Sequence, residues 1–189
     1  MKYDIYDINN KFAIRTLNDF SKTLMKLIAK KPFEKITVNE LCELCSYPRA
    51  TFYNYFEDIY SLLDYCWYSA IQEINIQDYL SIAPEVRAYV LFERFYDYLD
   101  KKRTDVERIL RLNETDGMLL ASMHRYMQKM MLEIIKDCPC SKQQEIPYEV
   151  VGRHFANTIL LVLQWGFVEK KKIDKEVSIS TLKYLLKDL

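Results

Sequence analysis

Glycine is nearly absent from this chain, with three residues among 189, and proline contributes only five. Few stretches alternate β-branched and polar residues, as a half-buried strand would. Apolar residues recur instead at the three- and four-residue intervals that place them on one side of a helix. The sequence therefore predicts an all-α protein, long enough for one domain or for a small domain joined to a larger one.

The prolines divide the chain into segments with helical periodicity. In the first segment Leu17, Phe20, Leu24 and Ile28 form one apolar stripe. No internal repeat and no low-complexity tract interrupts the pattern. We expect about nine helices, near residues 10–30, 38–45, 48–56, 59–79, 84–101, 104–112, 116–137, 148–170 and 174–188.

Charge and cysteine content narrow the class of protein. The formal net charge is zero, which argues against indiscriminate polyanion binding by the whole chain. Residues 1–56 nevertheless carry nine Lys and Arg against six Asp and Glu. No stretch reaches the roughly 18 apolar residues of a membrane span, and residues 1–11 lack the apolar core of a secretory signal. Five cysteines in such a chain favour reduced thiols and a cytoplasmic location.

The segment ITVNELCELCSYPRATFYNYF, residues 36–56, has the pattern of two short helices around a tight turn. Thr37 and Glu40 have the spacing of a capping box, so a helix should begin near residue 38. Tyr47 precedes a proline and is pushed out of the helical region, while Pro48 is preset to start a second helix. These features predict a helix-turn-helix.

The second short helix has two distinct sides. Phe52 and Phe56 are one turn apart and should face the core, which leaves small and polar groups on the outside. A helix without outward bulk fits the DNA major groove, and an arginine at its N-terminus can reach a guanine edge. The candidates on this helix are Arg49, Ala50, Thr51, Tyr53, Asn54 and Tyr55.

The extended segment ITVNELCELCSYPRATFYNYFEDIYSLL resembles the N-terminal signature of TetR/AcrR-family transcriptional regulators, over about residues 10–65. The segment ANTILLVLQWGFVEKKKID is similar, more weakly, to the family's C-terminal dimerisation helix. The resemblance implies a phosphate contact for Thr37, joined by Asn39. It implies base-edge or nearby backbone contacts for Arg49, Ala50 and Thr51, and mainly phosphate contacts for Tyr53, Asn54 and Tyr55.

Three positions depart from the family pattern. Ser46 stands at the turn glycine, so a positive φ there would be strained or relaxed away. Pro48 replaces a capping serine and offers no side-chain acceptor. Ile59 replaces a lysine and removes one phosphate contact, which predicts a shallower salt dependence of DNA binding than is typical of the family.

The remainder of the chain resembles an effector and dimerisation domain. Five of the seven methionines fall in residues 116–137, which would suit a soft wall around an apolar or aromatic effector, although such a stripe is more often core. The ligand-pocket candidates are Cys66, Phe92, Tyr96, Met123, His124 and Met127.

The segment ILLVLQWGF, residues 159–167, is apolar almost all round, so we expect one side of this helix to face its own core and the other a second copy of the chain. The dimer-interface candidates are Ile159, Val162, Trp165, Gly166, Leu182 and Leu186.

These observations predict a DNA-binding domain over 1–58 and an effector and dimerisation domain over 59–189. The expected function is a ligand-responsive regulator, most simply a repressor, that binds a palindromic operator in double-stranded DNA as a homodimer. No catalytic, cofactor or metal motif is recognisable.

Two alternatives stay open. One is an interaction module of the same fold that has lost DNA binding, suggested by Ile59 and the neutral charge. The other is a thiol or metal sensor that uses Cys138 and Cys140, whose spacing occurs at metal and redox sites. For Cys42 and Cys45, which have a similar spacing, we expect burial and packing as small apolar residues.

Overall fold

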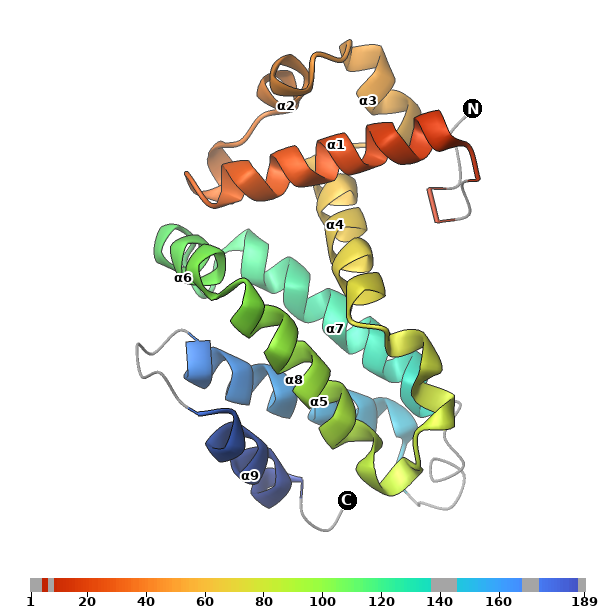
Figure 1. Cartoon of the computed structure of the whole chain (residues 1–189), viewed down its shortest axis with the longest axis vertical. Coiled ribbons are helices and arrows are strands. Elements are labelled where there is room, and N and C mark those ends of the chain that lie inside the picture. Colours follow the sequence, from red (N-terminus) through yellow and green to blue (C-terminus); the bar gives the residue numbers. More distant parts are fainter. Residues whose placement is uncertain (1–4, 7–8, 137–145, 168–173, 187–189) are drawn as a thin grey trace. The chain divides into compact units, whose positions relative to one another are not determined.

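The computed structural model describes residues 5–6, 9–136, 146–167 and 174–186 (Figure 1). In these residues the fold is all-α, as predicted, and no strand is found. No helix in this part of the chain is both long enough and apolar enough to cross a membrane. The described segments contain nine α-helices and two short 3-10 helices: α1 (Lys11–Ile28), η1 (Phe33–Lys35), α2 (Val38–Cys45), α3 (Arg49–Tyr55), α4 (Ile59–Glu73), η2 (Ile76–Ser81), α5 (Pro84–Lys101), α6 (Arg103–Leu112), α7 (Met118–Lys136), α8 (Tyr148–Phe167) and α9 (Lys175–Leu185).

The chain divides into two compact units. Unit 1 comprises Met1–Ala70 and Arg108–Ser122, and unit 2 comprises Ile71–Glu107 and Met123–Leu189. This grouping differs from the predicted division after residue 58. Residues 59–70, most of α4, belong to unit 1, where Leu62 and Leu63 are fully buried in the same core as α1 and α3.

The core of unit 1 is built around the predicted stripe of α1. Leu17, Phe20 and Leu24 have at most 1% of their surface exposed. Phe20 contacts Phe52 of α3 and Phe56, the residue after α3, edge to face, with ring centroids 5.4 and 6.3 Å away. Aromatic pairs of this geometry add to the hydrophobic stabilisation of the core and fix which side of α3 faces inward.

A buried asparagine joins distant parts of unit 1. The Asn113 side chain accepts a hydrogen bond from the Phe33 amide at 2.8 Å and donates to the carbonyl oxygens of Ile28 and Ile109, at 3.3 and 2.8 Å. Asn113 is 4% exposed, so these bonds replace lost water contacts. The ends of α1 and α6 are thereby held to the same side chain.

The fourth helix is shorter than predicted. α4 ends at Glu73, whereas the sequence suggested residue 79. Asn75 adopts the left-handed conformation with φ of 55°, which stops a helix, and the 3-10 helix η2 follows. The apolar residues at helical spacing continue past this point, and for that reason periodicity did not reveal the break.

Unit 2 packs α5, α8 and α9 together (Figure 1). Phe92 on α5 and Leu182 on α9 are completely buried, and Ile159 on α8 is 1% exposed. Tyr96 and Phe167 are in contact, with ring centroids 5.2 Å apart, and the Arg103 guanidinium lies over the Phe167 ring at 4.5 Å. The apolar side chains of α8 therefore find much of their cover within their own chain.

Candidate nucleic-acid interface

The start of α2 is capped by Thr37, as predicted. Its side-chain oxygen accepts a hydrogen bond from the Glu40 amide at 3.3 Å, and its backbone is extended. The Glu40 carboxylate pairs with the Lys31 ammonium at 2.5 Å. Thr37 and Asn39 are exposed at this helix start, where amide groups and the helix dipole favour an anion.

At the turn between α2 and α3, Ser46 keeps the positive φ and is not relaxed away from it. Its φ is 57° and its ψ 37°, so a non-glycine residue occupies the left-handed region. The Ser46 amide donates to the Glu43 carbonyl at 3.1 Å, and the Tyr47 amide donates to the Cys42 carbonyl at 3.0 Å. This pair of bonds is the Schellman motif that closes a helix C-terminus.

Tyr47 attaches this turn to α1. Its hydroxyl donates to the Asp19 carboxylate at 2.9 Å, and its ring lies 5.4 Å from that of Phe20. Pro48 then precedes α3 with φ of −61° and makes no side-chain cap, as predicted. The direction in which α3 leaves the turn is thus fixed by packing.

The two sides of α3 are those that the sequence predicts. Phe52 and Phe56 are completely buried. Arg49, Ala50 and Asn54 are exposed. Tyr53 is also exposed, whereas Thr51 and Tyr55 are partly buried at the edges of the outward side.

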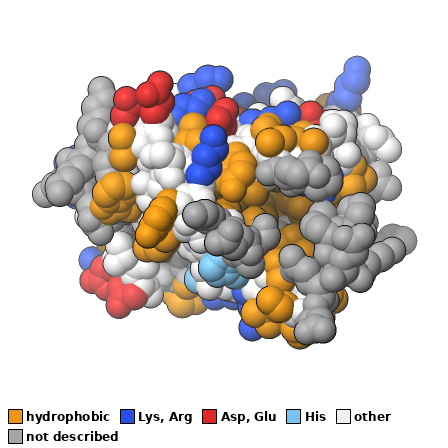
Figure 2. Space-filling view, turned by 90° about the horizontal axis from the view of Figure 1, so that it is seen from below, with side chains coloured by type: hydrophobic (Ala, Val, Ile, Leu, Met, Phe, Trp, Pro, Cys, Tyr) orange, Lys and Arg blue, Asp and Glu red, His pale blue; other side chains and the backbone are white. Residues whose placement is uncertain are grey.

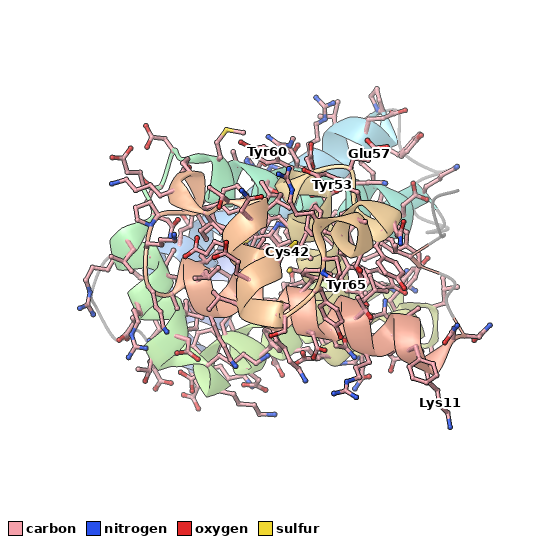
Figure 3. The ribbon with its side chains drawn as sticks, turned by 90° about the horizontal axis from the view of Figure 1, so that it is seen from above. Lys11, Cys42, Tyr53, Glu57, Tyr60 and Tyr65 are labelled. Atoms are coloured by element: carbon pink, nitrogen blue, oxygen red, sulfur yellow. The ribbon has the colours of Figure 1, made fainter. Side chains whose placement is uncertain are left out.

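Arg49 and Tyr53 form a pair on the outward side. The Arg49 Nη2 donates to the Tyr53 hydroxyl at 3.2 Å, with the guanidinium 5.7 Å from the ring centroid. Figure 3 looks onto this side of unit 1, with Tyr53 on α3 and Cys42 on α2. The pair thus presents the guanidinium donors of Arg49 and the phenol hydroxyl of Tyr53 side by side on the same face of α3.

The start of α4 contains a cap that the sequence analysis missed. The Asp58 carboxylate accepts from the Ser61 amide at 2.8 Å, and the Ser61 hydroxyl accepts from the Asp58 amide at 3.2 Å. The Asp-x-x-Ser spacing could have revealed it, because it is a capping box in which the shorter Ser side chain takes the place of the usual Glu or Gln. Ile59 packs against the core of unit 1. A carboxylate and an apolar residue therefore occupy the start of α4.

Cys42 and Cys45 have the environment of packing residues. Cys42 is 4% exposed, and Cys45 donates its thiol to the Thr23 hydroxyl at 3.2 Å. Burial raises the pKa of both thiols, which keeps them protonated and poorly nucleophilic. In the described residues no three His, Cys, Asp or Glu side chains are grouped as metal ligands. Cys138 and Cys140 lie outside those residues.

The ligand-pocket candidates are divided between the two units. Cys66 belongs to the core of unit 1, where it accepts a hydrogen bond from Ser21 at 3.2 Å. Phe92, Tyr96 and Met127 are buried in unit 2, and Met123 is half-buried. His124 is exposed and pairs with Asn157 at 2.8 Å. A depression described in unit 2 has a different, mostly charged lining: Glu73, Ile74, Asn75, Asp78, Arg94, Asp97, Tyr98, Lys101 and Lys102.

Most dimer-interface candidates are buried within their own unit, so their assignment to a partner surface is corrected. Val162 is 2% and Leu186 3% exposed, and Ile159 and Leu182 are at least as buried. A Cβ on Gly166 would lie 3.7 Å from the Ser178 hydroxyl of α9, so its close neighbour is in the same chain. Trp165 alone among the six candidates is partly exposed.

Other apolar side chains of α8 and α9 do reach the surface. Leu161 on α8 is 58% exposed and Tyr184 on α9 is 79% exposed, with Val150 and Val177 also exposed. Leu161 and Trp165 are one turn apart, so they share a side of α8. Figure 2 shows one face of the molecule on which hydrophobic side chains reach the surface in several separate groups.

The eight residues assigned to DNA thus lie between Thr37 and Tyr55, and six of them are exposed while two are partly buried. No protein-family model matches the chain, and no curated protein is significantly similar to it.

Proposed function

We propose that the protein is a DNA-binding transcriptional regulator that inserts α3 into the major groove. The observation that carries this proposal is the division of α3 into two sides. Two phenylalanines anchor it in the core of unit 1, while Arg49, Ala50 and Asn54 are exposed. A helix presented in this way, with small side chains outward, fits a groove about 12 Å wide.

The exposed groups divide by the contacts that they can make. Arg49 carries the paired donors that match the acceptors of a guanine edge. Tyr53 and the exposed start of α2 at Thr37 suit phosphate oxygens, which position a protein without reading sequence. Base readout is thus assigned chiefly to Arg49, and orientation on the duplex to Tyr53 and Thr37.

We assign dimerisation to the outward sides of α8 and α9, in place of their buried residues. Leu161, Trp165 and Tyr184 supply exposed apolar surface on two adjacent helices. A two-fold arrangement of such a surface is self-complementary and would present two copies of α3 to a palindromic operator. Response to an apolar or aromatic effector stays a prediction from the family resemblance.

One observation favours the alternative of an interaction module without DNA binding. Asp58 caps the start of α4 and Glu57 beside it is exposed, so this helix start is acidic. Such a cap would repel a phosphate there. The alternative predicts that the chain binds no duplex at low salt, whereas our proposal predicts that it does.

The test is a selection of duplexes from a randomised library by the purified full-length protein at about 0.1 M salt. We expect enrichment of an inverted repeat whose half-sites are one helical turn apart or a multiple of it. A pool that stays random after repeated rounds would contradict the proposal and support the interaction module.

A further inference from the structure

The outward side of α1 carries a row of cations that the assignment to α3 and the start of α2 does not use. Lys11, Arg15, Lys22 and Lys26 are all exposed. Their spacings of four, seven and four residues place them within about 60° of one another around the helix axis. We call these four residues the α1 ridge.

The core of unit 1 fixes the direction of the α1 ridge. Leu17, Phe20 and Leu24 on the opposite side are buried, so α1 cannot rotate without exposing them. α1 contains a single acidic residue, Asp19, which accepts the Tyr47 hydroxyl and lies 3.9 Å from the Arg15 Nε. For the three lysines of the α1 ridge the described residues provide no ion pair. Their charge is therefore directed into solvent.

The α1 ridge borders the turn that leads into α3. Asp19 lies at the edge of the ridge and holds Tyr47, which is two residues before Arg49. One turn further along α1, Thr23 accepts the thiol of Cys45 at the end of α2. The ridge is thus adjacent to the segment that positions α3. Figure 3 shows Lys11 extending from the N-terminal end of α1, on the side of unit 1 from which Tyr53 is also visible.

A second feature of this side is an exposed aromatic ring. Phe12 is 83% exposed in the first turn of α1, next to Lys11 in the sequence and about 60° from Arg15 around the helix axis. Its ring makes little contribution to the core, although its amide is satisfied by the Asn10 side chain at 2.9 Å. A row of cations beside an exposed aromatic residue matches a sugar-phosphate chain, which combines regular negative charge with apolar sugar edges.

We propose that the α1 ridge binds the phosphate backbone of duplex DNA that flanks the segment read by α3. The ridge extends about 22 Å along α1, at 1.5 Å per residue. A backbone of that length covers roughly six nucleotides of one strand at 3.4 Å each. The inference rests on the proposed function. It adds contacts between cations and phosphates, which strengthen binding but do not read the base sequence.

The test compares Lys22→Gln/Lys26→Gln with the control pair Lys101→Gln/Lys129→Gln, which removes the same charge from exposed positions of unit 2. Each protein is titrated with a selected duplex, either trimmed to the recognised repeat or extended by eight base pairs on each side. We expect wild type and the control pair to bind the extended duplex more tightly. The ridge variant should lose that gain, and its slope of log K against log salt should fall by about 1.8 per subunit for two lost phosphate contacts.

Lys22→Arg/Lys26→Arg keeps the charge and should restore both the gain and the slope. An unchanged slope in the Gln variant, or an equal loss in the control pair, would overturn the α1 ridge while leaving α3 as the reading helix. A wild-type protein that binds neither duplex would instead overturn the proposed function itself.

Discussion

The Arg49 guanidinium donates to the Tyr53 hydroxyl at 3.2 Å, one turn further along α3. Both side chains are on the solvent side of a helix whose other side is held by Phe52 and Phe56. The bond restricts the rotamers of Arg49 before any partner arrives, which lowers the entropy lost when it binds. The pair thus has the preorganisation that a sequence-reading side chain needs.

Replacing each member of this pair should have a different effect. Arg49→Ala should cost about 1–3 kcal/mol on the selected duplex and relax preference at one base position, because a bidentate contact to guanine is lost. Tyr53→Phe should weaken binding to selected and random duplexes by losing a phosphate contact. It should add a smaller loss on the selected duplex alone, because Arg49 is no longer held by the Tyr53 hydroxyl. The measurement is fluorescence anisotropy with both duplexes. An equal loss on both duplexes for Arg49→Ala would show that Arg49 contacts only the backbone.

The dimer should depend on the exposed apolar side of α8. Leu161→Arg should destabilise it by about 2 kcal/mol or more, the effect typical of a central interface residue. Light scattering at micromolar concentration should then report a lower mass than for wild type. Val86→Arg places the same charge at an exposed position of α5 and should leave the mass unchanged. A wild-type mass equal to one chain would exclude the dimer.

The strained turn gives a prediction on stability. Ser46→Gly should raise the free energy of unfolding by about 0.5–1 kcal/mol, because glycine adopts a φ of 57° without steric cost. Ser180→Gly, in the middle of α9, should lower it by a similar amount. Urea unfolding at pH 7 measures both. A loss of stability in Ser46→Gly would mean that the greater freedom of glycine in the unfolded chain exceeds the relief of strain.

Stability should also depend on Cys66 at high pH. Burial raises the pKa of its thiol from 9.0 to about 12. Between these values the unfolded chain loses the proton while the folded protein keeps it, so the free energy of unfolding falls as pH rises, by about 1.4 kcal/mol per pH unit. Below pH 9 both states keep the proton and the effect is absent.

Cys66→Ala removes this titration, so the difference in stability between wild type and the variant should shrink from pH 9 to pH 10.5. Urea unfolding across that range is the measurement. Parallel pH profiles for the two proteins would show that the Cys66 thiol is not desolvated in the folded state.

Helices α3 and α8 show what the sequence could and could not predict about the fold. The inward position of Phe52 and Phe56 follows from a one-turn spacing in a short helix with a single buried side. α8 is apolar almost all round, and hydropathy does not distinguish burial against α5 and α9 from burial against a second chain. Val162 was therefore assigned to a partner although it faces its own core.

Local backbone geometry was only partly predictable. The positive φ of Ser46 was one of two outcomes left open by the sequence, since a non-glycine residue at this turn either keeps the strain or relaxes it. Asn75 has nearly the same φ but lies within a continuous apolar pattern, so the end of α4 was placed too late. The cap between Asp58 and Ser61 was missed because residue 61 is Ser, whereas a capping box usually has Glu or Gln at that position.

The most direct test of the central claim is the affinity of Ala50→Glu for the selected duplex. Ala50 is exposed in the first turn of α3, where a carboxylate favours the helix, so the variant should remain folded. Thr104→Glu adds the same charge at an exposed position in the first turn of α6 and serves as control. Anisotropy titrations at about 0.15 M salt compare the three proteins.

If α3 enters the groove, a carboxylate at residue 50 faces phosphates and base edges at close range, and such like-charge contacts cost several kcal/mol. We therefore predict at least a hundredfold loss of affinity, about 3 kcal/mol, for Ala50→Glu, and a change within twofold for Thr104→Glu. Wild-type affinity in a folded Ala50→Glu protein would contradict the account, because α3 could not then be the helix that reads DNA.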